Sequence, residues 1–306
     1  MIKKIYQKIR WNFIYKYWPK NRYGGIHNVG CIKAKEMLSD MIDSGNPFAL
    51  ARIGFGEVDF LYEILQKEKN KEPLKDFQHA GLEDVLGYDE RLIERYENLM
   101  IESCKDIDMY ACWYRTFREA TLLKRLAKKT AIATDELVVE CFFDGDKAWM
   151  QKLAGKKVLV VTAFANTVEE QYKKRKEIFP NGFLPEFELK TFQSVWFDND
   201  AGKDERFSTW FDALDYMIAE IDKIDYDIAL LGCGAFGTPI LSHMKRQGKQ
   251  AIYVGGILQL MFGIRGSRWD DPSYSAYHSL FNEHWVYPGA DNKPQNAENL
   301  ENGCYW

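Results

Sequence analysis

The sequence lacks the patterns that place a chain in a membrane or in an oxidising compartment. No apolar stretch approaches the roughly 20 residues that a membrane-spanning helix needs. The six cysteines form no C-x-x-C pair and no zinc-ligand spacing, and no secretory apolar region precedes them. We therefore expect reduced thiols in a cytoplasmic protein.

Two common catalytic motifs are missing, and acidic residues are missing from one end of the chain. There is no G-x-S-x-G elbow and no P-loop lysine, which disfavours a serine hydrolase and a P-loop NTPase.

Residues 1–35 contain nine Lys or Arg and no acid, so a net charge of −4 overall leaves −13 for the rest. A body with that charge argues against a nucleic-acid partner, because phosphate backbones require a positive face.

Residues 1–30 are predicted to form a basic, aromatic N-terminal arm that contains a helix. The segment MIKKIYQKIRWNFIYKYWPKNRY mixes basic residues with Ile, Phe, Trp and Tyr. Each basic group near an anionic membrane adds about 1 kcal/mol to binding, and Trp and Tyr favour the headgroup level. Two interpretations stay open. Residues 1–22 contact the inner face of the cell membrane, or the helix packs on its own domain.

The remainder, residues 31–306, is predicted to be a single α/β domain built from two Rossmann-like halves, 31–155 and 156–306. Segments with the character of buried strands are FALARIG (48–54), MYACWY (109–114), KKVLVVTAF (156–164), FELKTFQSVWF (187–197), DIALLGCG (227–234) and QAIYVGG (250–256). Helical periodicity separates most of them, which predicts a largely parallel sheet with helices on both faces. Ligands of such sheets bind beyond the carboxyl ends of the strands.

The first candidate site lies at the end of the first strand and contains Arg52, Gly54, Gly56 and Glu57. Two glycines allow the backbone to approach a ligand closely, a guanidinium binds phosphate, and a carboxylate serves as a base or a metal ligand. An alternative explains the same residues without a ligand: Arg52 pairs with Glu57, and Glu57 stabilises the helix N-terminus.

The second candidate site is a G-x-G-x-x-G turn. It contains Gly232, Gly234, Ala235 and Gly237. Exposed amides at a helix N-terminus bind anions, but the acid that an NAD site needs about 20 residues later is replaced by Gly255 and Gly256. This argues against NAD, and the late position in the chain argues against a methyltransferase. We predict phosphate or sugar contact by this turn and by the Gly255–Gly256 pair.

Two further groups are candidates. Thr162 and Asn166 place a hydroxyl and an amide at a third strand end, although Asn166 with Glu169 also fits a helix N-cap. The stretch GIRGSRW holds Arg265 and Arg268 between glycines, which suits a pyrophosphate clamp or, alternatively, a solvated basic loop.

The residues of the first two sites resemble those of a known family. LARIGFGE (50–57) resembles the R-[FIL]-G-D-G-E motif of the GT-D-type glycosyltransferases, and the stretch 226–256 looks like their second half. The resemblance implies a bacterial, Rossmann-like enzyme of polysaccharide biosynthesis that uses a sugar nucleotide and typically a divalent cation, Mn or Mg. It covers residues 48–63 and 226–256.

One position departs from the family motif. Phe55 stands where the family has an Asp that is expected to hold the metal together with the residue matching Glu57. The departure weakens the expectation of a metal, and Asp59 would replace the missing acid only if the turn rotates. The resemblance implies that Glu57 is the general base or a metal ligand and that Arg52 positions it or the diphosphate. The two arginines of GIRGSRW would then neutralise the leaving group.

The predicted function is transfer of a sugar from a nucleoside diphosphate donor to a glycan or lipid-linked acceptor. Two alternatives stay open. One is a catalytically silent Rossmann-like scaffold subunit of a membrane-associated glycan assembly complex, which the loss of the family Asp favours. The other is a different sugar-nucleotide or phospho-sugar enzyme.

Overall fold

The computed structural model describes most of the chain beyond the N-terminal arm: residues 22–23, 26–27, 29–70, 83–86, 89–112, 117–126, 130–134, 136–139, 141–198, 202–289 and 293–306. Residues 1–21 lie outside the described residues, so the predicted helix and membrane contact stay predictions. The end of the arm forms a short antiparallel pair, β1 (Arg22–Tyr23) with β2 (Ile26–His27). Among the described helices, none has the length and apolar character to cross a membrane.

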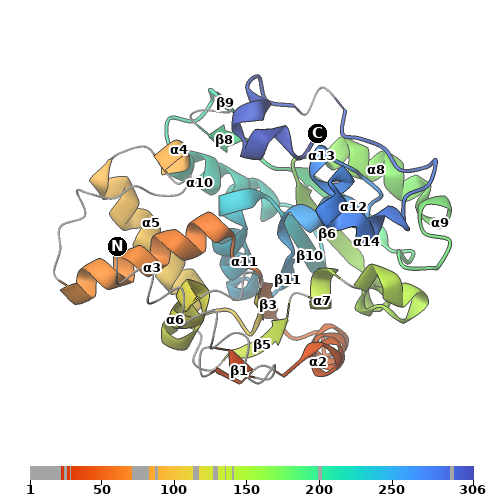
Figure 1. Cartoon of the computed structure of the whole chain (residues 1–306), viewed down its shortest axis with the longest axis horizontal. Helices are drawn as coiled ribbons and strands as arrows, with labels where there is room; N and C mark the ends of the chain where they lie inside the picture. The colour runs from red at the N-terminus through yellow and green to blue at the C-terminus, as the bar shows by residue number, and fades with distance from the viewer. Residues whose placement is uncertain are drawn as a thin grey trace.

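In the described part of the chain, seven parallel strands form one sheet in the order β5-β4-β3-β11-β10-β6-β7 (Figure 1). Their bounds are β3 (Phe48–Ala51), β4 (Met109–Cys112), β5 (Ala131–Thr134), β6 (Lys157–Thr162), β7 (Glu188–Gln193), β10 (Ile228–Gly232) and β11 (Gln250–Tyr253). A two-stranded antiparallel sheet, β8 (Phe197–Asp198) with β9 (Gly202–Lys203), lies beside it. The predicted parallel α/β architecture is confirmed.

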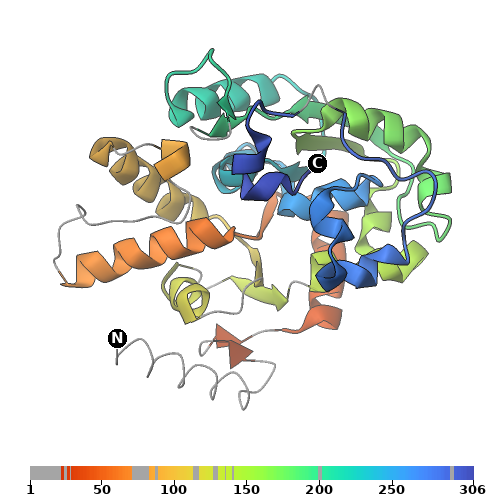
Figure 2. The same cartoon turned by 45° about the horizontal axis from the view of Figure 1, so that its top comes forward.

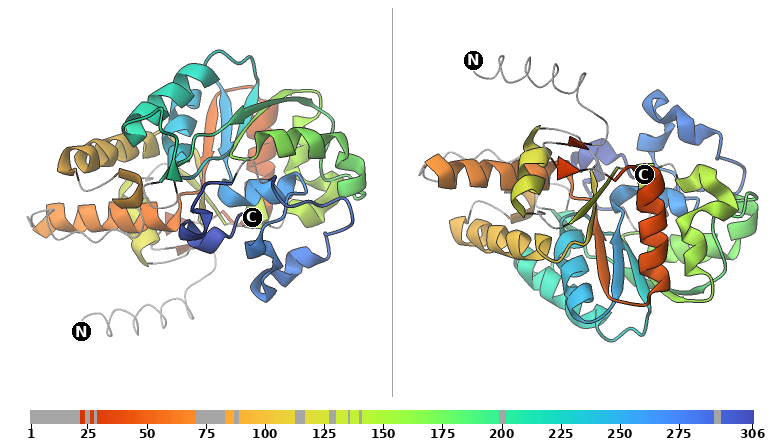
Figure 3. Two further views of the ribbon diagram at one scale, coloured as in Figure 1. Left: turned by 90° about the horizontal axis from the view of Figure 1, so that it is seen from above. Right: turned by 90° about the horizontal axis from the view of Figure 1, so that it is seen from below.

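The sheet is buried on both faces by two apolar layers. Along β6, Val158 and Val160 enter one layer while Leu159 and Val161 enter the other, because successive strand side chains point to opposite faces. One layer contains α3 (Phe55–Asn70), α5 (Glu90–Cys104), α6 (Phe117–Leu126), α10 (Trp210–Ile221) and α11 (Gly237–Arg246). The other contains α2 (Cys31–Asp43), α7 (Glu136–Val139), α8 (Ala165–Lys173), α12 (Leu258–Met261) and α13 (Ser267–Asp270). Figure 3 shows the helices of both layers on opposite sides of the strands.

The direction in which successive strands are added to the sheet reverses at its centre. β3, β4 and β5 extend the sheet outward on one side, β6 and β7 extend it on the other, and β10 and β11 fill the space between. β11 pairs with β3 in parallel, with Gln250 opposite Phe48, so one sheet runs through both predicted halves. The boundary near residue 155 stays a prediction. The carboxyl ends of β3, β11, β10 and β6 consequently lie next to one another.

Candidate functional site

The four neighbouring strand ends carry the turns that the sequence predicted as sites. Arg52 and Gly54 follow β3, and the Gly255–Gly256 pair follows β11. The Gly232–Gly234 turn follows β10, and Thr162 ends β6. Because all four strands are parallel and adjacent, the structure brings these turns to one edge of the sheet.

Glu57 is a buried carboxyl in the first turn of α3, with only 7% of its surface exposed. Its Oε2 accepts a hydrogen bond from the Gly54 backbone N–H at 2.6 Å. Since α3 begins at Phe55, this is the contact by which a carboxylate at the third helical position caps a helix. A Cβ at Gly54 would lie 2.4 Å from Oε2, so a larger residue here would displace the Glu57 carboxyl from its present position. The helix-stabilising role that the sequence left open is therefore present.

The second carboxyl oxygen of Glu57, Oε1, does not take part in capping α3. Oε1 of Glu57 is buried and has no hydrogen-bond partner among the described residues. Burial raises the pKa of Glu57 to about 7, against the opposing effects of the Gly54 N–H and the Arg52 charge. A carboxyl that titrates near neutrality and keeps one oxygen unpaired is suited to proton transfer at physiological pH.

Arg52 connects the turn after β3 to the turn after β11. Its Nη1 donates a hydrogen bond to the carbonyl oxygen of Val254 at 3.0 Å. The next residue, Gly255, has φ +68°, and a Cβ there would lie 3.2 Å from Nη1 of Arg52. The glycine is thus required both by its backbone angle and by the guanidinium group beside it. The positive charge of Arg52 is held at the centre of the sheet edge.

Two glycines of the G-x-G-x-x-G turn serve packing. A Cβ at Gly232 would lie 2.9 Å from the carbonyl oxygen of Gly255, so this glycine lets the β10 and β11 turns touch. A Cβ at Gly237 would lie 2.5 Å from two ring carbons of Tyr253. Gly237 therefore allows α11 to approach β11, as the third glycine of a dinucleotide fingerprint does. Their assignment to direct phosphate contact stays a prediction.

The middle of the same turn faces outward. Gly234 is exposed and has φ +57°, with nothing within 4 Å of the position a Cβ would take, and Ala235 beside it is half-buried. The Tyr253 hydroxyl donates a hydrogen bond to the Gly234 carbonyl oxygen at 2.9 Å and holds the turn from behind. α11 starts at Gly237, so its positive end lies at this turn. Gly234 and Ala235 are the part of the motif that a phosphate can reach.

The turn after β6, which contains Thr162 and leads to Asn166, differs from the predicted helix start. α8 begins at Ala165 and its N-cap residue is Phe164, whose side chain makes no capping hydrogen bond, so the predicted cap by Asn166 is wrong. The amide of Gln193 replaces it: Oε1 accepts from the Ala165 N–H at 3.2 Å, and Nε2 donates to the Ala163 carbonyl at 2.6 Å. The Thr162 hydroxyl is buried and accepts from the Phe164 N–H at 3.3 Å. Asn166 is exposed at this edge.

The acids proposed as metal ligands have separate partners. Asp59 forms an ion pair with Arg118 of α6 at 2.7 Å, whereas Glu57 bonds to Gly54. Residues two apart on a helix point about 200° apart around its axis, which accounts for this separation. The described residues contain no group of three or more His, Cys, Asp or Glu placed to hold a metal ion. The divalent cation stays a prediction.

The two arginines of GIRGSRW also have different surroundings. Arg265 pairs with Asp270 through Nε at 3.2 Å and Nη2 at 2.5 Å, and its guanidinium lies over the rings of Phe281 and Tyr287. Arg268 instead lies at the glycine turn of β11, where a Cβ at Gly256 would be 3.5 Å from its Nη1. The structure thus brings Arg268 to the strand ends and pairs Arg265 with a carboxylate.

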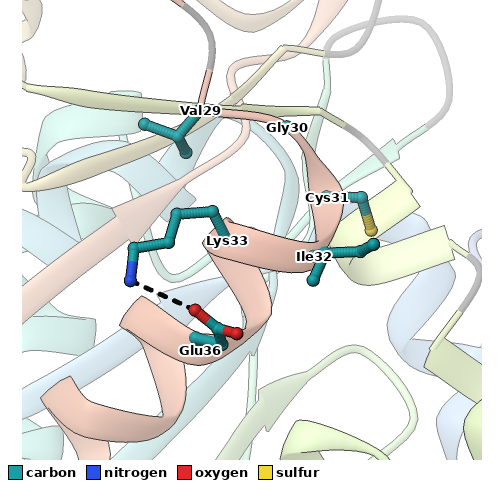
Figure 4. A pocket seen from close by; sticks show the side chains of 6 residues that line it. All are labelled: Val29, Gly30, Cys31, Ile32, Lys33 and Glu36. Carbon is teal, nitrogen blue, oxygen red and sulfur yellow. Dashed lines mark hydrogen bonds and ion pairs between the residues drawn. The ribbon is translucent and has the colours of Figure 1, made fainter.

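A surface hollow at the start of α2 lies in a different part of the fold (Figure 4). Its charged side chains, Lys33 and Glu36, pair with each other at 3.1 Å. Val29 at its rim donates a backbone hydrogen bond to Ile132 of β5, the outermost strand on that side. None of the glycine-turn residues lines the hollow, and we assign it no ligand.

No protein-family model and no curated protein matches the sequence. The fold is similar to two solved structures, each 12% identical to this chain and each matched over 84% of this chain and 83% of the other. One, with a TM-score of 0.46, is described as a selenomethionine-substituted structure of domain of unknown function 1792. The other, with a TM-score of 0.48, is described as showing that this highly conserved domain has a distinct glycosyltransferase fold.

Proposed function

We propose that this protein is a glycosyltransferase that moves a sugar from a nucleoside diphosphate donor to a glycan or lipid-linked acceptor in cell-surface glycan biosynthesis. One observation carries the proposal. The Glu57 carboxyl, with a pKa of about 7, shares one sheet edge with Arg52 and with the glycine turns of β10 and β11. A proton acceptor beside cations and exposed amides is what transfer from a diphosphate leaving group requires.

Each group has a defined role in the proposed reaction. The amides of Gly234 and Ala235, at the positive end of α11, bind the donor diphosphate. Oε1 of Glu57 takes the proton of the acceptor hydroxyl while the hydroxyl oxygen of the acceptor forms a bond to the anomeric carbon of the donor sugar. The bond from this carbon to the diphosphate breaks, and the diphosphate leaves with the electron pair. Arg52 and Arg268 offset its negative charge.

A thermal-shift screen with UDP-, GDP-, CMP- and dTDP-sugars, each with and without manganese, tests the proposal. A ligand at about 100 times its Kd adds about 2.7 kcal/mol of stability, which raises the unfolding midpoint by several degrees. We expect a shift with one nucleotide, followed by release of that nucleotide when an acceptor is supplied. The matching free sugar, which lacks the diphosphate, is the control. The absence of a shift with every nucleotide would contradict the proposal and favour the silent scaffold.

The two arginines of GIRGSRW give a matched pair of variants. Arg268→Ala is expected to weaken binding of the stabilising nucleotide about 10- to 100-fold, since a hydrogen bond from a charged group contributes about 1.5–3 kcal/mol. Arg265→Ala removes a guanidinium that already pairs with Asp270, so we expect affinity within about threefold of the original. Titration calorimetry measures both. Equal losses would restore the two-arginine clamp predicted from the sequence.

A further inference from the structure

The last residues of the described chain lie across the proposed site. The C-terminal end of the chain lies next to α13 (Figures 1 and 2), and Cys304, Tyr305 and Trp306 form hydrogen bonds with α12 and α13. Backbone N–H groups of Arg268 and Ser267 donate to the carbonyl oxygens of Cys304 and Trp306, each at 3.0 Å. The Gln259 side chain donates to the carbonyl oxygen of Tyr305 at 2.9 Å. We refer to residues 304–306 as the strap.

The strap covers the two groups at the β11 turn that the proposed reaction needs. A Cβ at Gly256 would lie 3.2 Å from a ring carbon of Tyr305, so the tyrosine ring covers this glycine. The Arg268 guanidinium lies 4.8 Å from the centre of the same ring and donates from Nη2 to the Cys304 sulfur at 2.8 Å. Arg268 therefore binds the strap in the place where it would bind a phosphate.

The far end of the strap reaches another strand end. The Trp306 ring lies 6.0 Å from that of Phe164, just after β6, and 5.4 Å from that of Trp196, just after β7. β10 stands between β11 and β6 in the sheet, so the strap passes from one side of the β10 turn to the other. A donor diphosphate at the exposed Gly234 and at Ala235 would lie next to this crossing.

The partners that the strap offers to Arg268 are weak ones for a guanidinium. They are a thiol and a phenol, and burial raises the pKa of that phenol, Tyr305, so it stays neutral although Arg268 and Arg52 act to lower it. A diphosphate offers the same arginine charged oxygens, which form shorter and stronger hydrogen bonds than neutral groups do. A diphosphate therefore competes with the strap for Arg268.

We propose that the strap is a gate over the Arg268 side of the donor site, closed in this structure, and that a diphosphate-bearing ligand opens it by taking Arg268 from Tyr305 and Cys304. The proposal rests on the proposed function for the identity of the ligand. The strap then controls access to the donor site and takes no part in the reaction itself. The proposal predicts that the ligand and the closed strap exclude each other.

Pyrophosphate binding to a Tyr305→Ala variant tests the gate by titration calorimetry. Loss of the ring removes a competitor for Arg268, so we expect pyrophosphate to bind about 10-fold more tightly than to the original protein, a gain of about 1.4 kcal/mol. Tyr287→Ala is the matched control, because Tyr287 lies over Arg265, 5.1 Å from its guanidinium, in the same loop region. It should leave the affinity unchanged. Unchanged affinity in Tyr305→Ala, or weaker binding, would overturn the gate.

A second measurement leaves the strap sequence intact. Cys304 is half-buried, and Cys31 is the other free cysteine that is not buried, so a Cys31→Ser variant isolates the Cys304 thiol. Opening by pyrophosphate should raise the rate of Cys304 alkylation by iodoacetamide several-fold, as resolved by peptide mass analysis. An unchanged or slower rate at saturating pyrophosphate would overturn the gate even if Tyr305→Ala does not fold.

The two proposals fail in different ways. Tighter pyrophosphate binding in Tyr305→Ala without turnover of any sugar nucleotide would leave the gate standing and remove the transferase. Turnover by the original protein with no effect of Tyr305→Ala on pyrophosphate would remove the gate alone. Failure of pyrophosphate to bind either protein would overturn the gate, while the sugar-nucleotide screen would still decide the function.

Discussion

Replacement of Glu57 by Gln is expected to remove most of the turnover and, at the same time, to stabilise the folded protein at pH 8. The loss of turnover follows from the proposed role, because a positioned general base contributes about 10²- to 10⁴-fold to a rate. The gain in stability follows from burial. The Glu57 side chain is charged above its pKa of about 7, and its Oε1 then lacks a partner among the described residues. A glutamine carries no charge and can still accept the Gly54 hydrogen bond.

The pH dependence of this gain has a definite sign. The pKa of Glu57 is about 7 in the folded protein, against 4.5 as its ordinary value. Between these values the folded protein keeps a proton that the unfolded chain has lost, so the free energy of unfolding falls as pH rises from 4.5 to 7. The fall amounts to about 3 kcal/mol and is complete above pH 7. Below pH 4.5 the original protein and Glu57→Gln should therefore have similar free energies of unfolding.

Urea unfolding at pH 4.5, 6 and 8 measures this difference. We expect Glu57→Gln to gain about 3 kcal/mol over the original protein at pH 8, and the gain to shrink toward zero at pH 4.5. The control is Glu220→Gln, which removes an exposed carboxylate of α10 that pairs with Lys223 and should leave the pH dependence unchanged. A constant difference at all three pH values would show that Glu57 titrates normally. A stability cost of this size at Glu57 would fit the proposed role of its carboxyl as a general base.

The sheet could be predicted because its central strands carry continuous apolar runs. β6, with KVLVVT, is buried along nearly its whole length, as a central parallel strand must be. The strand missed by this reasoning is β5, whose four residues AIAT are too short and too small to give a pattern. It forms because β4 offers an open edge, with Met109 opposite Ala131. Neither fact is visible in a local window of sequence.

The site could be predicted only in part, because one residue type serves several purposes. Glycines that touch a ligand and glycines that touch another strand look alike in a sequence, and Gly237 proves to face Tyr253. Asn166 has the chemistry of a cap, but α8 already begins at Ala165, whose N–H donates to Gln193 from β7. Tyr305 is more than 200 residues away from Arg52 along the chain, so no spacing rule joins them.

Gly237→Ala is expected to lower the free energy of unfolding by about 2–3 kcal/mol and to weaken nucleotide binding, although alanine is ordinarily the better helix former. The new Cβ would lie 2.5 Å from two ring carbons of Tyr253. That ring cannot turn away, because it is buried and its hydroxyl is bonded to Gly234. α11 must therefore move off β11, and the amides of the β10 turn move with it.

A double-mutant cycle with Tyr253→Leu separates this clash from any other effect of the alanine. Leucine removes the ring atoms that the Cβ would meet, so Gly237→Ala in that background should cost less than about 0.5 kcal/mol, or stabilise the protein. Urea unfolding of the four proteins gives the coupling energy, which we expect to be about 2 kcal/mol. Additive losses would mean that Gly237 does not act through Tyr253. In that case the glycine would be required at the ligand side of the turn, as its place in the G-x-G-x-x-G motif first predicted.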